Sequence, residues 1–261
     1  MGKEETRKYH EENRRRWNVA SRAYQESIES SGLWEKLPSD PALFFYRDEM
    51  EIIGDVKGKR VAVLGSGDNH AAFALAGMGG KVTSVDISEK QLAAAERRAM
   101  KLGLDISFVR ADVTDLDGLK SGDFDLVYTG GHLDVWVADL GKFYSEAVRI
   151  LKPGGLFVVM EYHPFRRVFI EGSGSKFELT CLYFKRGPYH YDAQTDFPWD
   201  TDRPTPQHEF HWTIGDMATT MLGSGCRIIA LKEMGEEREE WEPVDLTGLP
   251  RRILLAGKKE A

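Results

Sequence analysis

The sequence contains only two cysteines among its 261 residues. Cys181 and Cys226 occur singly, without a CxxC pair or a metal-ligand spacing around either residue. A disulfide framework or a zinc module needs more thiolates at closer spacing. The sequence therefore indicates a protein of a reducing compartment, the cytoplasm.

Long apolar runs and a signal-peptide pattern are also missing. No stretch approaches the roughly 18–20 consecutive apolar residues that a membrane span needs, and the chain begins with polar and charged residues. The first six residues fit the loose myristoylation pattern, but their acidic flank and the lack of a second anchor favour a chance match. We expect no membrane partner.

Positive charge is in deficit, since 35 Lys and Arg stand against 42 Asp and Glu for a net charge of −7. This balance opposes the large phosphate-binding surface of a nucleic-acid protein. The densest basic run, Arg14–Arg16, has acidic neighbours and suits a solvated helix face. The GxxxxGK[ST] loop that cradles nucleotide phosphates is absent too. We expect a small-molecule partner and no nucleic acid, and nothing in the sequence indicates an oligomeric state.

From residue 60 onward, short apolar segments alternate with segments of helical period, which is typical of βαβ units around a buried parallel sheet. The expected strands are Arg60–Leu64, Lys81–Ile87, Ile106–Val109, Phe124–Thr129, Leu156–Glu161, Cys226–Glu233 and Arg252–Ala256. The expected helices are Ala71–Ala76, Glu89–Leu102, Asp139–Leu151 and Ile214–Leu222. Ser88 is expected to cap the second of these helices.

Two helices are expected before the first strand, and they define an N-terminal helical cap over residues 1–57. In Glu11–Ser27, the residues Trp17, Ala20 and Tyr24 follow one helical stripe. After a proline-containing break, Ala42–Ile53 has the pattern of a second helix.

The remaining residues, 58–261, are expected to form one domain with an aromatic-rich insertion at about 162–212. The insertion holds 12 of the 28 aromatic residues and four of the seven histidines. It follows the carboxyl end of a strand, where open α/β sheets bind ligands. We therefore favour a pocket or lid over the alternative, a hydrophobic cover on a sheet edge.

A glycine turn links the first expected strand to the next helix. Gly65 and Gly67 lack a Cβ, so backbone N–H groups at the helix start can approach an anionic ligand. Asp86 ends the second expected strand, about 20 residues on, where a carboxylate can accept hydrogen bonds from ribose hydroxyls. Asp112 closes the third strand and can accept from an exocyclic amine such as that of adenine. His70 stands where a dinucleotide fingerprint has its third glycine, which counts against NAD.

These motifs in this order resemble the class I S-adenosylmethionine (SAM)-dependent methyltransferases, particularly the small-molecule group that includes ubiquinone-biosynthesis C-methyltransferases. The resemblance covers residues 58–162 firmly. The segments that carry it are Val63–Asn69, Val85–Ser88, Arg110–Val113, Phe124–Val127 and the helix-ending Leu151–Gly155.

The resemblance implies a Rossmann-like α/β fold, a seven-stranded, mostly parallel sheet with helices on both faces and an antiparallel last strand. It also implies SAM as cofactor and S-adenosylhomocysteine (SAH) as product. The cofactor-binding residues that it implies are Tyr24, Gly65, Ser66, Gly67, Asn69, Asp86, Ile87, Asp112, Val113, Thr129 and Gly130. Trp17 is a further candidate from the N-terminal helix.

Motif I departs from the family pattern at Val63, usually acidic, and at Asn69, usually glycine. Asn69 tolerates unusual backbone angles, so the turn survives. Asp68, His70 or an N-terminal residue is expected to supply the missing polar contacts to the methionine part of SAM.

A sulfonium methyl is already activated, so positioning and exclusion of water can supply most of the catalysis. Should the acceptor need a base, His132 and His163 lie at the right end of the sheet. O-, N- and C-methylation stay open, as do two other classes: an NAD(P)-binding oxidoreductase and a non-catalytic SAM-binding module. The two histidines of His208–His211 are too few and too divergent in direction for a metal site, so no metal is expected.

Overall fold

Residues 2–169, 179, 181–192, 205–235 and 248–260 are described in the computed structural model. A seven-stranded sheet forms its centre, with the order β3-β2-β1-β4-β5-β9-β8. Its strands are β1 (Arg60–Leu64), β2 (Lys81–Asp86), β3 (Ile106–Arg110), β4 (Phe124–Gly130), β5 (Leu151–Tyr162), β8 (Cys226–Met234) and β9 (Arg252–Lys259). The pairs among β1 to β5 are parallel, and β9 runs antiparallel to both β5 and β8. The expected Rossmann-like sheet with an antiparallel last strand is confirmed.

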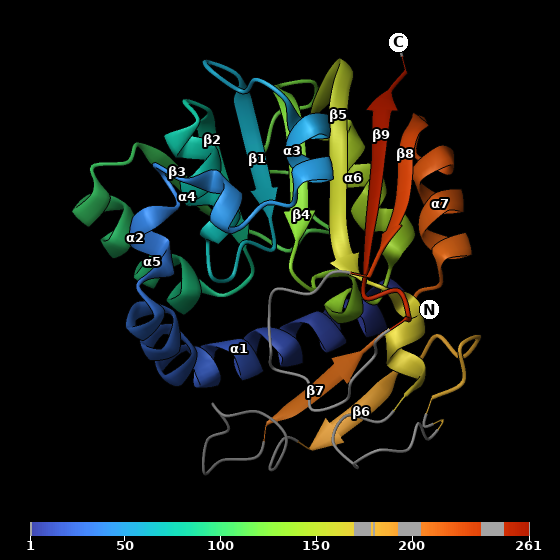
Figure 1. Cartoon of the computed structure of the whole chain (residues 1–261). Helices are drawn as coiled ribbons and strands as arrows, with labels where there is room; N and C mark the ends of the chain where they lie inside the picture. The colour runs from blue at the N-terminus through green and yellow to red at the C-terminus, as the bar shows by residue number, and fades with distance from the viewer. Residues whose placement is uncertain (1, 170–178, 180, 193–204, 236–247, 261) are drawn as a thin grey trace.

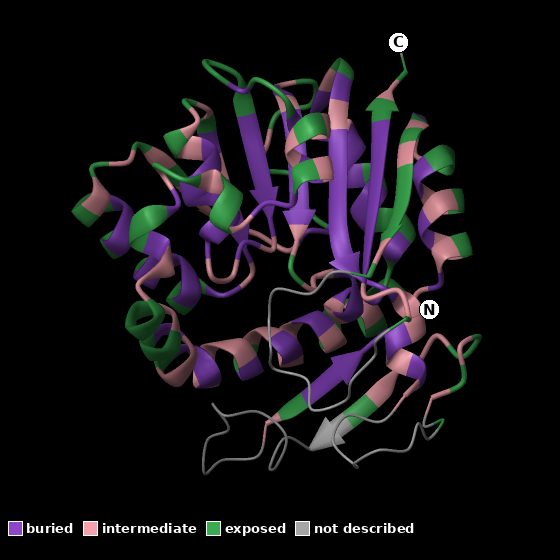
Figure 2. Cartoon of the chain, in the orientation of Figure 1, coloured by how far each residue is buried: buried purple, intermediate pink, exposed green. Residues whose placement is uncertain are grey.

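Helices cover both faces of the sheet, because successive side chains of a buried strand point to opposite faces. On β1, Val61 and Val63 join the core that packs under one set of helices, whereas Ala62 and Leu64 join the core on the other face. The first set is α3 (Arg47–Ile53), α4 (His70–Gly77) and α5 (Glu89–Leu102); the second is α6 (Leu140–Ile150) and α7 (Ile214–Gly223). The central strands are buried, while the edge strand β8 is largely exposed (Figure 2).

The element boundaries follow their local chemistry. The Ser88 hydroxyl accepts the Gln91 N–H at 3.2 Å and begins α5, as expected from the sequence. β5 starts earlier than expected, at Leu151, because Leu151 pairs with Phe124 before a register shift that takes up the proline and glycines after it. The register shift absorbs residues that would otherwise break the ladder.

The N-terminal region differs from the expectation in length and continuity. The first helix, α1, spans Lys3–Ser31 rather than residues 11–27. It is followed by a short helix, α2 (Leu33–Lys36). The single helix expected over residues 42–53 is wrong: a 3-10 turn, η1 (Pro41–Leu43), is separated from α3 by extended backbone at Tyr46, which caps α3.

α1 lies across the edge of the sheet at which β1, β4 and β5 end (Figure 1). On its far side is a two-stranded antiparallel sheet of β6 (Tyr189–Asp192) and β7 (Pro206–Glu209), which the sequence did not reveal. Two further 3-10 turns are η2 (Asp134–Trp136), after β4, and η3 (Pro164–Val168), after β5. Thus α1 is held between the sheet edge and the small β6–β7 sheet.

Candidate functional site

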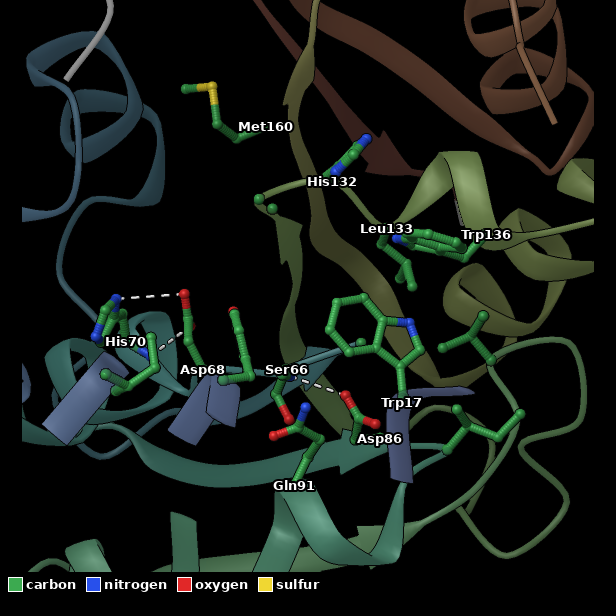
Figure 3. Close-up of a pocket in the computed structure, with 18 of the residues that line it drawn as sticks. Trp17, Ser66, Asp68, His70, Asp86, Gln91, His132, Leu133, Trp136 and Met160 are labelled. Atoms are coloured by element: carbon green, nitrogen blue, oxygen red, sulfur yellow. Dashed lines mark hydrogen bonds and ion pairs between the residues drawn. The ribbon is translucent and has the colours of Figure 1, made fainter. Parts of the chain in front are cut away.

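A cavity of about 440 Å³ lies between α1 and the carboxyl ends of β1, β2 and β4. It is lined by residues of α1, β2, β4 and η1. The glycine turn after β1 and the loop after β4 line it as well (Figure 3). Ten of the residues expected from the sequence line it: Tyr24, Gly65, Ser66, Gly67, Asp86, Ile87, Asp112, Val113, Gly130 and His132. Trp17, Asp68 and His70 line it as well.

Asp86 and the glycine turn meet directly. One carboxylate oxygen, Oδ2, accepts the Gly67 N–H at 2.8 Å, and Oδ1 accepts the Ser88 N–H at 2.8 Å. Burial raises the pKa of Asp86 above its ordinary value, while these two backbone donors act in the opposite direction. A carboxylate oxygen has two lone pairs, so Asp86 keeps acceptor capacity toward the cavity.

Asn69 supports the turn from behind. Its backbone has a φ of 65°, in the left-handed region that asparagine tolerates. Its side chain accepts the Ser84 hydroxyl at 2.6 Å and donates to the Gly67 carbonyl at 3.1 Å. Asn69 is fully buried and does not line the cavity, so the structure gives it a role in shaping the turn rather than a ligand contact.

A buried amide pair, which the sequence did not indicate, joins α1 to α5 beside the turn. Gln25 donates to the Gln91 Oε1 and accepts from the Arg98 guanidinium. The Gln91 amide nitrogen, Nε2, is buried and has no hydrogen-bond partner among the described residues. Gln91 lines the cavity next to Ser66 and Asp86 (Figure 3). An isolated glutamine on an amphipathic helix carries no signal of such a contact.

Aromatic rings close the cavity on the side of α1. The ring of Trp17 stands edge-on to those of Tyr24 and Trp136, each at a centroid distance of 5.5 Å. Trp136 comes from η2. Aromatic walls of this kind exclude water and fix the orientation of a bound ring.

The loop after β4 presents His132 to the cavity with a φ of 93°. A non-glycine residue in this region is strained, and such strain clusters at functional sites. Burial and the nearby cations Arg167 and Arg166 hold the pKa of His132 well below its ordinary value. The imidazole is therefore neutral at physiological pH, and one of its ring nitrogens has a free lone pair.

Two buried carboxyl groups hold this loop in place. Glu161 Oε1 accepts the backbone N–H groups of Leu133 at 2.7 Å and Asp134 at 3.2 Å. The Asp134 carboxyl accepts the Tyr144 hydroxyl at 2.9 Å. Burial raises the pKa of Glu161 to about 7, and burial together with Glu161 raises that of Asp134 well above its ordinary value.

At the other end of the cavity, α3 and β4 contribute a buried hydrogen-bonded pair. Tyr128 donates to Glu49 Oε1 at 2.6 Å, and Glu49 Oε2 accepts the Tyr46 N–H at 3.0 Å. Burial and Glu49 raise the pKa of Tyr128 well above its ordinary value. A Cβ at position 130 would lie 2.3 Å from the Tyr128 hydroxyl, so Gly130 makes room for this pair.

Two expected site residues lie elsewhere. Thr129 points to the opposite sheet face from its cavity-lining neighbours Tyr128 and Gly130, as strand alternation requires. His163 is buried away from the cavity, with Nε2 at 2.8 Å from Glu233 and Nδ1 accepting the Phe165 N–H. Its pKa is lowered by burial, but its contacts are structural.

The insertion contributes less to the cavity than expected. Among its described residues, only Gln207 lines the wall. Two of its histidines pack on α1 instead, since His190 and His208 contact the ring of Tyr9. The aromatic walls expected from this segment come from α1 and from the loop after β4. Within the part of the chain that the structure describes, no group of three or more metal-ligating side chains is found.

Comparison with known proteins identifies the fold. Residues 63–159 match the family described as methyltransferase domain. The chain therefore resembles a methyltransferase domain over these residues. The resemblance to class I SAM-dependent methyltransferases expected from the sequence is thereby confirmed.

Curated methyltransferases are similar to part of the chain. A ubiquinone biosynthesis O-methyltransferase of Caulobacter sp. (strain K31) is 35% identical over 103 residues, 40% of either chain. A demethylmenaquinone methyltransferase of Clavibacter sepedonicus is 36% identical over 111 residues, 42% of this chain and 44% of the relative. The matched region thus spans less than half the length of both relatives.

Solved structures extend the likeness beyond this methyltransferase domain. The crystal structure of a SAM-dependent methyltransferase from Mesorhizobium loti superposes with a TM-score of 0.64 at 25% identity. The alignment covers 85% of this chain and 98% of that protein. Among the described residues, no helix is long and apolar enough to cross a membrane.

Proposed function

We propose that the protein transfers a methyl group from SAM to a small-molecule acceptor bound in the cavity beneath α1. The observation that carries this proposal is the hydrogen bond of 2.8 Å from the Gly67 N–H to Asp86 Oδ2. Both residues line one cavity, which Asp112 and Val113 also line. The glycine turn, the carboxylate that we propose for the ribose and the loop that we propose for the adenine line one cavity, which supports an adenosyl ligand there.

The residues present fit this cofactor. Asp86 would accept the ribose hydroxyls, and Asp112 and Val113 would border the adenine. The buried Gln91 Nε2, a donor on the cavity wall without a partner among the described residues, would find an acceptor in the ligand, which removes the cost of leaving it unpaired. Trp17 and Tyr24 would cover the bound cofactor from α1.

SAM, when bound, would supply an activated methyl group on its sulfonium. An in-line nucleophile of the acceptor would take this methyl group, with SAH as the leaving group. The rings of Trp17 and Trp136 exclude water from the transfer path, which strengthens the electrostatic interactions inside the cavity. Neutral His132 at the cavity wall accepts a proton from the acceptor. A proton-accepting residue at this place favours an acceptor with an acidic group, such as a hydroxyl, over an amine that is already nucleophilic.

Calorimetry tests the cofactor first. We expect the protein to bind SAH and not NADH, because the third glycine of the dinucleotide turn is replaced by His70. NADH binding without SAH affinity would instead identify an oxidoreductase.

Transfer is tested with methyl-labelled SAM and a small-molecule extract of the host cell, from which the labelled product is identified. SAH binding without any labelled product would indicate a SAM-binding module that does not transfer.

We further propose that the enzyme works in the cytoplasm. Neither Cys181 nor Cys226 forms a disulfide, which supports a reducing compartment. Cell fractionation tests this, and recovery with the membrane or exported fraction would contradict it.

A further inference from the structure

His10 on α1 joins two loops at the rim of the cavity. It is only 4% exposed. Its Nδ1 lies 2.7 Å from Asp112 Oδ2, in the loop after β3, and its Nε2 lies 2.9 Å from the backbone nitrogen of Ala138, before α6. One imidazole therefore connects α1 to two segments that are far apart in the sequence.

These contacts fix the protonation of the ring. A backbone N–H only donates, so Nε2 must accept the bond from Ala138 and carries no hydrogen. The remaining nitrogen, Nδ1, then carries the hydrogen and donates it to Asp112. A second proton would place one donor against another at Ala138, so this arrangement needs a neutral His10.

The Asp112 carboxylate is held from both sides. Its Oδ1 accepts the N–H and the hydroxyl of Thr114, each at 2.8 Å, while His10 holds Oδ2. Burial alone would raise the pKa of Asp112, but the bonds from His10 and Thr114 keep it below its ordinary value. The group is thus a charged acceptor in one orientation, and its side chain stays 23% exposed at the cavity.

We propose that His10 is a positioning residue that orients Asp112 to accept the exocyclic amine of the adenine, and that it couples this recognition to the docking of α1. The inference rests on the proposed function, since it assigns a partner to one group of the cofactor site. Through His10, the base of the cofactor and the helix that covers it share one hydrogen-bonded chain: adenine, Asp112, His10 and Ala138.

Two substitutions test the two hydrogen bonds of the imidazole separately. In His10→Asn, the side-chain amide reaches the position of Nδ1 and can still donate to Asp112, but it cannot reach Ala138. In His10→Gln, the amide oxygen reaches the position of Nε2 and can accept from Ala138, but the donor to Asp112 is lost. The full chain is used in both cases, with thermal unfolding as the check that each variant folds.

The readout is calorimetric affinity for SAH against S-inosylhomocysteine, in which a carbonyl oxygen replaces the exocyclic amine and faces the carboxylate as a second acceptor. The wild type is expected to prefer SAH by about 10- to 100-fold, the range for a charge-assisted hydrogen bond. His10→Asn should keep most of this preference. His10→Gln should lose most of it, as should Asp112→Asn.

A purely structural role for His10 would lower the affinity for both ligands by the same factor in both variants and leave their ratio unchanged, which would overturn the proposal. Nitrogen-15 NMR of the histidine ring gives an independent check without ligand. It should show hydrogen on Nδ1 only, and hydrogen on Nε2 would contradict the assignment. A wild type that binds neither ligand would instead refute the proposed function and this inference with it.

Discussion

The Oδ2 atom of Asp86 lies 2.8 Å from the backbone nitrogen of Gly67, so the end of β2 holds the glycine turn that follows β1. Removing this carboxylate should loosen the turn and delete the acceptor that we propose for the ribose hydroxyls. We expect Asp86→Ala to weaken SAH binding by about 1.5–3 kcal/mol, the cost of a hydrogen bond to a charged group. Isothermal titration calorimetry measures the change.

Asp125→Ala is the matched control for this prediction. Asp125 lies near the start of β4 and pairs with Lys152, at the opposite end of the strand from the cavity. It should leave SAH affinity as it is. An unchanged affinity in Asp86→Ala would remove Asp86 from the cofactor site.

His132 combines a cavity-facing imidazole with a strained backbone, and the two can be separated by substitution. Asparagine adopts positive φ values readily but cannot serve as the base. His132→Asn should therefore lower the rate of methyl transfer by about 10²- to 10⁴-fold, the range for general-base catalysis, with SAH affinity unchanged. Single-turnover kinetics with the identified acceptor check this, and a variant with full activity would show that no base is needed.

Glu161 makes stability depend on pH with a definite sign. Its pKa in the folded protein, about 7, lies above the ordinary value of 4.5, so the folded state binds more protons than the unfolded state between these values. The free energy of unfolding should therefore fall as pH rises from about 4.5 to 7. Asp134, Arg252 and Arg167 are the charged groups that act on Glu161.

Glu161→Gln should remove about 2 kcal/mol of this pH dependence, measured by urea unfolding at pH 5 and pH 8. Glu146→Gln is the contrasting control. Its carboxylate is also buried, but Arg149 and Lys142 hold its pKa below the ordinary value, so its contribution is lost only in acid. Equal slopes for wild type and Glu161→Gln would contradict the prediction.

Asn13 connects α1 to β7 and η2 by hydrogen bonds. Its side chain accepts the N–H of His208 at 2.8 Å and donates to the His208 carbonyl at 2.9 Å and to the Trp136 carbonyl at 3.3 Å. Asn13→Ala leaves buried backbone groups unpaired, at a cost of about 1–3 kcal/mol. We expect faster hydrogen exchange at the His208 amide and faster SAH dissociation in stopped flow.

Arg22→Ala serves as the control on the same helix, because Arg22 is exposed and pairs with Glu26 one turn along α1. It should change neither quantity. A slow, wild-type exchange rate at His208 in Asn13→Ala would show that α1 is held by its other contacts.

The fold could be predicted from the sequence because each βα unit has a recognisable local pattern of apolar and turn residues. Alternating side chains such as Val61 and Ala62 must serve two opposite cores. The glycine turn and Asp86 mark the edge at which open α/β sheets bind ligands. The full length of α1 could not be predicted from the sequence because the face that α1 buries is polar. His10, Asn13 and Gln25 are among its buried residues. Hydrophobic periodicity does not register such a face.

The site was harder to predict where it depends on partners distant in the sequence. His10 and Gln91 are ordinary residues of amphipathic helices until folding brings them to Asp112 and Gln25. Thr129 does not line the cavity, because proximity to a strand end does not determine the face to which a side chain points. His163 lies at the end of the sheet that the sequence predicts, but its Nε2 forms a hydrogen bond with Glu233.

The double hydrogen bond between Asn13 and the backbone of His208 imitates the pairing of a neighbouring strand. Asn13 thereby occupies the amide and carbonyl that β7 would otherwise offer at its edge away from β6. The sheet that β7 forms with β6 has two strands among the described residues. Exposed strand margins of this kind are templates for association between chains. With Asn13 bound there, this amide and carbonyl of β7 are not open to edge-to-edge pairing with another chain.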